Sequence, residues 1–392
     1  MSASGEARRR IYFDHNATTY MRREVLDAMM PFFIDKFGNA SSLHLFGQEA
    51  REAVEEAREK VAKLINSEPE EIYFTSGGTE SDNLAIRGVL RARRDVKPSH
   101  VITSLIEHSA VLNTCKSLES DGVEVTYLSP DRNGVIRPEL VRDAIKDNTV
   151  LISIMLANNE TGVIQPVEEI SAVAKEKGIT FHTDAVQGVG KIPVDVEKLG
   201  VDLLAMSAHK FYGPKGIGAL YVRRGTKIEP VYTGGGHERG MRSGTENVPA
   251  IVGLGEAARI SGEELSEEMA KLRALRDKLE DGVLEKIGDV VILGRDANRV
   301  PNTSSILVKG IEGEAVTLNM SVKGFGLSSG SACSSDEPGP SHVITAMGVD
   351  PIYAQGSVRV SLGIANTEED VELFLEFFPS VVEKLRKMSP LA

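Results

Sequence analysis

The 392-residue sequence has little cysteine, no long apolar run and no excess of positive charge. Its two cysteines, Cys115 and Cys333, exclude the disulfide framework of a small secreted protein and are too few to form a zinc site without histidines. No apolar run approaches the length of a membrane span, and the polar amino terminus differs from a signal peptide. We therefore expect a protein of the reducing cytoplasm with no membrane segment.

The net charge of −12 argues against binding to duplex nucleic acid or to an anionic membrane, because contacts with phosphate need local positive charge. The short run Arg8–Arg10 does not change this expectation and resembles a solvated tail. Hydrophobic residues make up 41% of the chain and charged residues 26%, which is typical of globular proteins. At this length one hydrophobic core is rarely enough, so two domains are expected.

Short, nearly continuous apolar runs alternate with helical periodicity through the first two thirds of the chain. This pattern is typical of an α/β fold with a mostly parallel sheet covered by helices on both faces. The remainder predicts a smaller α+β domain. We expect a large domain over residues 15–260 and a small domain over 1–14 and 261–392. The predicted strands of the large domain are Glu71–Thr75, His100–Ser104, Val123–Leu128, Val150–Leu156, Thr180–His182, Leu203–Met206 and Ala219–Val222.

An acid and a lysine follow two neighbouring predicted strands. Asp184 lies with Gln187 after the first, and Lys210 lies between His209 and an aromatic pair after the second. A pyridine-aldehyde cofactor needs a lysine for its Schiff base and an acid to keep its ring nitrogen protonated. For an isolated Asp/Lys pair a surface salt bridge is the better expectation. Here the other polar candidates also follow strands, and ligands bind at that edge of such sheets.

Two glycine-rich segments leave alternatives open. Ser76–Thr79 joins a strand to a helix, where backbone N–H groups suit a phosphate. By itself the turn favours a plain helix cap made by the side chain of Thr79 or Ser76. The segment 233–247 contains glycines and two arginines. Its composition indicates an anion-binding loop and a flexible hinge equally.

The two cysteines occupy contrasting surroundings. Cys333 lies in a run of small, polar and turn-forming residues, about 327–341, which predicts an exposed loop. Cys115 lies in the predicted helix Ser109–Ser120, where an inert, buried thiol is expected. A thiol on a mobile loop is suited to moving between two reaction partners.

Eight ordered motifs between residues 11 and 388 resemble the cysteine desulfurases of the NifS/IscS type. The ordered set is specific, although no single motif is. The motifs are Phe13–Thr19, Thr75–Asn83, Asn158–Gly162, His182–Gln187, Ser207–Lys210, Arg242–Thr245, Ser329–Cys333 and Val358–Gly363. The resemblance implies aminotransferase fold type I with a seven-stranded sheet, a homodimer, and pyridoxal 5′-phosphate near the subunit interface.

The resemblance also implies roles for individual residues. Lys210 would bind the cofactor covalently and act as the base for the substrate Cα proton. Asp184 would pair with the ring nitrogen, His108 would stack on the ring and Gln187 would bond its hydroxyl. Arg359, with Asn159, would bind the substrate carboxylate. The phosphate would be held by Gly78, Thr79, Ser207 and His209, with Thr245 from the other subunit.

The implied reaction converts L-cysteine to L-alanine and leaves the sulfur as a persulfide on Cys333. An acceptor would then take this sulfur for iron–sulfur cluster assembly or tRNA thiolation. With a scaffold partner's cysteines, Cys333 would be a transient ligand of a [2Fe-2S] cluster, since one thiol cannot hold a cluster alone. A selenocysteine lyase or β-lyase, and a non-catalytic scaffold that docks an assembly partner, are the alternatives.

The carboxylates of the acidic residues that follow Cys333 should raise the pKa of its thiol.

Overall fold

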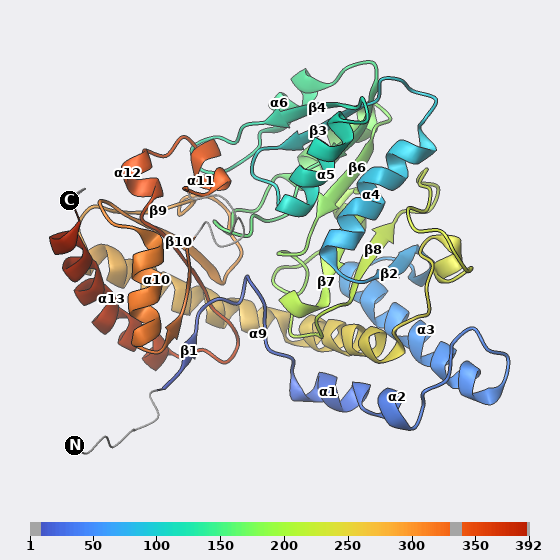
Figure 1. The fold of residues 1–392 in the computed structure, drawn as a ribbon, viewed down its shortest axis with the longest axis horizontal. Helices are drawn as coiled ribbons and strands as arrows, with labels where there is room; N and C mark the ends of the chain where they lie inside the picture. Colours follow the sequence, from blue (N-terminus) through green and yellow to red (C-terminus); the bar gives the residue numbers. More distant parts are fainter. Residues whose placement is uncertain (1–8, 330–338, 390–392) are drawn as a thin grey trace.

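A computed structural model describes residues 9–329 and 339–389, and its centre is a seven-stranded sheet (Figure 1). The strand order is β2-β8-β7-β6-β5-β3-β4. Strand β8 is antiparallel to both of its neighbours, and the other pairs are parallel. This confirms the predicted mostly parallel sheet. The strands are β2 (Ile72–Thr75), β3 (His100–Ser104), β4 (Glu124–Leu128), β5 (Thr149–Ser153), β6 (Thr180–Asp184), β7 (Leu203–Ser207) and β8 (Gly218–Val222).

Helices cover both faces of this sheet, and alternate strand residues face each layer. Leu203 packs in the cluster of α4 (Gly78–Ala92) and α5 (Ser109–Glu119). Its neighbour Leu204 packs in the cluster of the helices on the opposite face. With both faces buried, the strands need the near-continuous apolar runs seen in the sequence. The opposite layer contains α3 (Leu45–Ile65), α6 (Pro138–Ala144), α7 (Val167–Glu176) and α8 (Val196–Leu199).

A second hydrophobic core lies under a four-stranded antiparallel sheet of order β12-β13-β10-β9. Four phenylalanines, Phe13, Phe325, Phe374 and Phe378, are fully buried in it. Amino-terminal residues complete this part, because β1 (Ile11–Tyr12) pairs with β11 (Phe325–Gly326). Its other elements are β9 (Val290–Ile292), β10 (Thr303–Val308), α10 (Gly313–Val322), β12 (Ser328–Ser329), α11 (His342–Ala346), α12 (Pro351–Ala354), β13 (Ser357–Ser361) and α13 (Glu368–Met388).

One helix, α9 (Val248–Lys286), runs from the first core into the second (Figure 1). It is one continuous helix of 39 residues. Before the large sheet the chain forms two short helices, α1 (Arg23–Met29) and α2 (Pro31–Ile34), because Pro31 interrupts the helical backbone pattern. In the described ranges, no helix has the length and apolarity needed to cross a bilayer.

Candidate active site

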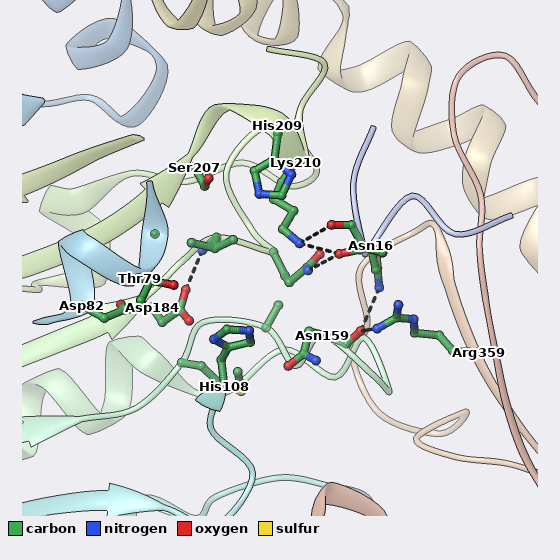
Figure 2. Close-up of a pocket in the computed structure, with 16 residues that line it drawn as sticks. Asn16, Thr79, Asp82, His108, Asn159, Asp184, Ser207, His209, Lys210 and Arg359 are labelled. Carbon is green, nitrogen blue, oxygen red and sulfur yellow. Dashed lines mark hydrogen bonds between the residues drawn. The ribbon is translucent and has the colours of Figure 1, made fainter. Parts of the chain in front are cut away.

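A cavity of about 310 Å³ opens at the carboxyl ends of β6 and β7 (Figure 2). Asp184 ends β6 and Ser207 ends β7, and the parallel pairing of these strands brings both residues to one sheet edge. Ten predicted site residues line the cavity: Gly78, Thr79, His108, Asn159, Asp184, Gln187, Ser207, His209, Lys210 and Arg359. Thr245 is exposed and does not line it, and Cys333 lies outside the described residues.

The start of α4 forms one end of the cavity. The residue before the helix, Gly77, has φ +151°, and no side chain in the described part of the protein caps the helix. The predicted cap by Thr79 or Ser76 is therefore wrong; the Ser76 N–H instead donates to Glu80 in the first turn. Uncapped N–H groups at a helix start favour an anion. Arg242 pairs with Glu80 at 2.8 Å, so the 233–247 segment is fastened beside this helix start.

Asp184 is a buried carboxyl at the end of β6, and it lies beside Thr79 in the cavity (Figure 2). Its Oδ1 accepts a hydrogen bond of 2.9 Å from the Val186 N–H. Burial raises the pKa of Asp184, while the basic groups His108 and Lys210 and the hydrogen bond from Val186 lower it. A cationic group bound beside Asp184 would lower the pKa of this carboxyl further and favour the ionised carboxylate.

His108 precedes α5 and projects into the cavity. Its Nδ1 accepts a hydrogen bond of 3.1 Å from the Ala110 N–H, so the neutral ring carries its proton on Nε2. Burial lowers the pKa of His108, and the charges of Lys210 and His342 lower it further, whereas Asp184 acts in the opposite direction. A neutral imidazole with a fixed orientation is therefore available at this wall.

Lys210 lies in the short 3₁₀ helix η2 (Ala208–Lys210) that follows β7. Its Nζ donates to the backbone oxygens of Asn16 at 2.7 Å and Ala17 at 2.9 Å. The Gln187 side-chain amide also donates to the Asn16 oxygen, at 3.0 Å. The backbone oxygen of Asn16 thus holds both the amine and the amide, and Figure 2 shows the Lys210 amine beside Asn16.

Arg359, on the buried strand β13, forms the opposite wall with Asn159. Its Nη1 donates to the Asn159 backbone oxygen at 3.0 Å, and its Nη2 pairs with Asp14 at 2.8 Å. Its buried Nε has no hydrogen-bond partner among the described residues. A guanidinium with unused donors beside a cavity is suited to binding a carboxylate.

The described residues on both sides of the Cys333 segment lie close to this wall. Ser328 pairs with Arg359 in the small sheet. After the segment, the Ser341 hydroxyl donates to Glu160 at 2.5 Å, and His342 Nε2 lies 3.0 Å from the Glu107 backbone oxygen. The other thiol, Cys115, is fully buried in α5, as predicted, and burial raises its pKa to about 12.

These residues fit pyridoxal phosphate. The uncapped helix start, with Ser207 and His209 beside it, offers donors for a phosphate. Asp184 offers a carboxylate for a protonated ring nitrogen. The lysine amine points into the same cavity (Figure 2). A Cβ on Gly78 would lie 2.7 Å from Val186 Cγ2, so the helix start and the β6 loop are already in close contact.

Two polar residues that line the cavity, Asn16 and Asp82, were not among the predicted site residues. Asn16 belongs to the quoted Phe13–Thr19 motif, but its main role is through a backbone oxygen, which a residue type does not reveal. Asp82 follows Thr79 by about one helical turn, and this spacing places both on one face of α4. That spacing was the available signal for Asp82.

Comparisons with known proteins agree with this geometry. The family model for aminotransferase class V matches residues 11–374. The cysteine desulfurase IscS of Methanosarcina thermophila is 51% identical over 97% of this chain and 94% of its own length. A solved structure described as a NifS-like protein has a TM-score of 0.90 and 43% identity, covering 96% of this chain and all of its own. A second, described as SspA in complex with cysteine, has a TM-score of 0.79 and 40% identity, covering 90% of this chain and 98% of its own.

The predicted resemblance and fold type are thereby confirmed, and the family uses pyridoxal phosphate, the cofactor that the cavity fits. The chain belongs to the class-V aminotransferases, within the NifS/IscS-type cysteine desulfurases.

Proposed function

We propose that this protein is a cysteine desulfurase that converts L-cysteine to L-alanine and transfers the sulfur to Cys333 and then to an acceptor. The observation that carries the proposal is the single cavity that gathers Lys210, Asp184, His108 and Arg359. The family supplies the reaction class, since relatives about 50% identical along almost the whole chain are named cysteine desulfurases.

The cofactor would be held by the residues of the large-sheet wall. Gly78, Thr79, Ser207 and His209 would bind its phosphate, Asp184 its ring nitrogen and Gln187 its ring hydroxyl. Gln187 already uses one amide hydrogen on Asn16, which leaves its second for the hydroxyl. His108 would stack on the ring. Bound pyridoxal phosphate supplies an electron sink for charge that develops at the substrate Cα.

The substrate carboxylate would bind to Arg359, with Asn159 beside it. This places the Cα proton near Lys210, whose amine would remove it as the base. The ion pair with Asp14 partly neutralises the positive charge of Arg359 and holds its guanidinium in place. The amine and the guanidinium thus fix the two ends of one small amino acid.

Cys333 would attack the substrate sulfur as a thiolate. A bond forms between the two sulfur atoms, the carbon–sulfur bond breaks, and its electron pair remains on the carbon fragment, which takes up protons and leaves as L-alanine. The positions of Ser328, Ser341 and His342 support this role, because the chain enters and leaves the Cys333 segment beside Arg359 and Glu107.

An assay with L-cysteine, pyridoxal phosphate and a thiol reductant tests the proposal by measuring L-alanine and sulfide. Equal amounts of the two products are expected. Cys333→Ala should abolish sulfide release and leave cofactor binding intact, and Cys115→Ala is the matched control that should retain both. Full turnover by Cys333→Ala would contradict the persulfide route and favour a β-lyase. A comparison with L-selenocysteine would separate the two substrate preferences.

The protein would act as a homodimer. An apolar patch, consisting of Phe33, Ile34, Phe37, Leu43, Leu45 and Phe46, is between 52% and 85% exposed per residue. Such a patch is unusual on a monomer. A second copy would cover it and would supply Thr245 to the phosphate site. Analytical ultracentrifugation should show a dimer, and Phe37→Glu should shift it toward monomer, whereas a monomeric wild type would overturn the assignment.

The acceptor would be an iron–sulfur scaffold protein in the cytoplasm or the tRNA-thiolation machinery. A transient [2Fe-2S] cluster shared by Cys333 and the scaffold would accompany the first route. Among the described residues, no group of three His, Cys, Asp or Glu side chains is placed to bind a metal, so the scaffold would supply the remaining ligands. Adding candidate scaffolds singly to the assay tests this, with acceleration of alanine formation as the expected result.

A further inference from the structure

Three buried carboxyl groups lie close together at the ring-nitrogen end of the cavity: Asp82, Glu107 and Asp184. Three negative charges in a site with so little water would repel one another strongly, so most of these groups must be protonated. The question is which of the three carries the charge.

Hydrogen bonds distinguish the three groups. Asp184 accepts from the Val186 N–H, and Glu107 Oε1 accepts from the Ser104 hydroxyl at 2.6 Å and the Met155 N–H at 3.1 Å. Asp82 Oδ1, in contrast, has no hydrogen-bond partner within the described part of the chain. A carboxylate without donors is the least stable of the three in its ionised form.

The polar atom recorded facing Asp82 Oδ1 is His182 Nε2, at 3.5 Å, and it too lacks a hydrogen-bond partner among the described residues. His182 precedes Asp184 by two positions on β6, so both side chains point to the face that α4 covers. The other ring nitrogen, Nδ1, lies 2.8 Å from Ser153 Oγ. Two atoms without hydrogen-bond partners among the described residues therefore face each other, and Asp82 itself lines the cavity together with Asp184, the carboxyl that would bind the ring.

We propose that Asp82 and His182 form a neutral positioning pair that leaves Asp184 as the sole ionised carboxyl at the ring-nitrogen end. Asp82 stays protonated and donates a hydrogen bond to His182 Nε2, while the Nδ1–H of the neutral His182 ring donates a hydrogen bond to the Ser153 hydroxyl. A side-chain adjustment of a few tenths of an ångström brings the 3.5 Å contact into hydrogen-bond range and satisfies both orphan atoms. The proposal deepens the proposed function, on which it rests.

The surrounding charges agree with this arrangement. Burial raises the pKa of Asp82 well above its ordinary value, and the charges of Asp184 and Glu107 raise it further. Burial lowers the pKa of His182 to about 3, so its ring is neutral. Burial also raises the pKa of Glu107 to about 8. Of the three carboxyl groups, only Asp184 has basic side chains, His108 and Lys210, that lower its pKa.

The test uses the full-length holoenzyme with Asp82→Asn, Asp82→Ala, His182→Phe and His182→Gln. The pH midpoint of the cofactor's visible absorption band reports the charge near the ring. Asp82→Asn, a neutral substitute, should leave it within about 0.3 pH unit of wild type. His182→Phe removes the group that accepts the Asp82 hydrogen bond. Protonated Asp82 then donates its hydrogen bond to Asp184 instead, and the midpoint moves by about one pH unit. His182→Gln, which retains an acceptor, should restore it.

Thermal unfolding across pH gives a second readout. The folded protein keeps the Asp82 proton above pH 4 and the unfolded chain releases it, so this group lowers wild-type stability as pH rises. Asp82→Asn should therefore gain melting temperature relative to wild type from about pH 4 upward. Ser81→Ala, which removes a buried hydroxyl from the next position of α4, is the control and should show no such pH-dependent gain.

Two results would overturn the proposal. A large midpoint shift in Asp82→Asn would mean that Asp82 is ionised. Unchanged midpoints in all four variants, with lower stability only, would mean that the pair has a purely structural role. Neither readout needs turnover of cysteine. An enzyme that binds the cofactor and shows the expected shifts but makes no alanine would refute the proposed function alone.

Discussion

The two walls of the active-site cavity are built in different ways. On the large-sheet wall, the functional groups follow strand ends or begin helices, so the backbone itself fixes Asp184, Lys210 and His108. On the other wall, Arg359 and Asn16 are held by polar contacts that cross between distant segments. The difference indicates a preorganised cofactor end and a substrate end whose geometry depends on how the two parts of the chain meet.

Replacing the cofactor-wall amine should have the largest effect. Lys210→Ala removes the predicted covalent attachment and the base, so turnover of L-cysteine should fall at least about 10³-fold. Borohydride reduction followed by mass spectrometry of the intact protein should show no bound cofactor mass. Lys215→Ala, an exposed lysine five positions later, is the control and should behave as wild type. Cofactor still fixed to the Lys210→Ala chain would show that another lysine is the attachment site.

On the opposite wall, Arg359→Lys keeps the charge but loses the planar fork that binds a carboxylate with two parallel bonds. The lost binding free energy of about 1.5–3 kcal/mol corresponds to a KM for L-cysteine raised roughly 10- to 150-fold. Cofactor affinity should remain unchanged, which steady-state kinetics and absorption titration together establish. Arg295→Lys, an exposed arginine that pairs with Asp281, provides the control. Weakened cofactor binding with an unaltered KM would remove the distinction between the walls.

The contact between Glu160 and Ser341 joins the two walls, and it predicts a pH effect on stability. Burial raises the pKa of Glu160 to about 7, although Ser341 and Arg359 act against it. The folded protein thus keeps a proton that the unfolded chain releases above about pH 4.3, and wild-type stability falls up to pH 7. The Glu160→Gln variant has no carboxyl proton at this position, so its stability should not show this fall between about pH 4 and pH 7.

Glu160→Gln should therefore be as stable as wild type near pH 4 and more stable by about 2–4 kcal/mol at pH 7 and above. Urea unfolding at several pH values measures the difference. Glu168→Gln, an exposed substitution on α7, should show no trend. A Glu160→Gln protein that is less stable at pH 7 would mean that the carboxylate is ionised and pairs across the walls.

The sequence predicted the large-sheet wall better than the other wall, for physical reasons. Buried strands such as Leu203–Met206 need continuous apolar residues, and their ends can be located from composition alone. Strand β13 was not predicted as a strand, because the buried Arg359 interrupts its apolar pattern. Asp82 resembles an ordinary exposed helix residue until the fold buries it. The predicted cap at Thr79 was wrong because the same residue types serve a helix cap and a phosphate site.

The smallest expected effect tests how rigid the cofactor wall is. In Gly78→Ala, the added Cβ would lie 2.7 Å from Val186 Cγ2, so the β6 loop must move by a fraction of an ångström. Crowding of this kind costs about 1 kcal/mol or more. Alanine recovers about 1 kcal/mol of helix propensity, so the melting temperature should change little. Cofactor affinity should still fall a few-fold, because Asp184 lies two residues before Val186. Gly78→Ala/Val186→Ala should restore it, as measured by equilibrium titration. Unchanged affinity in the single variant would show that this wall adjusts as easily as the other.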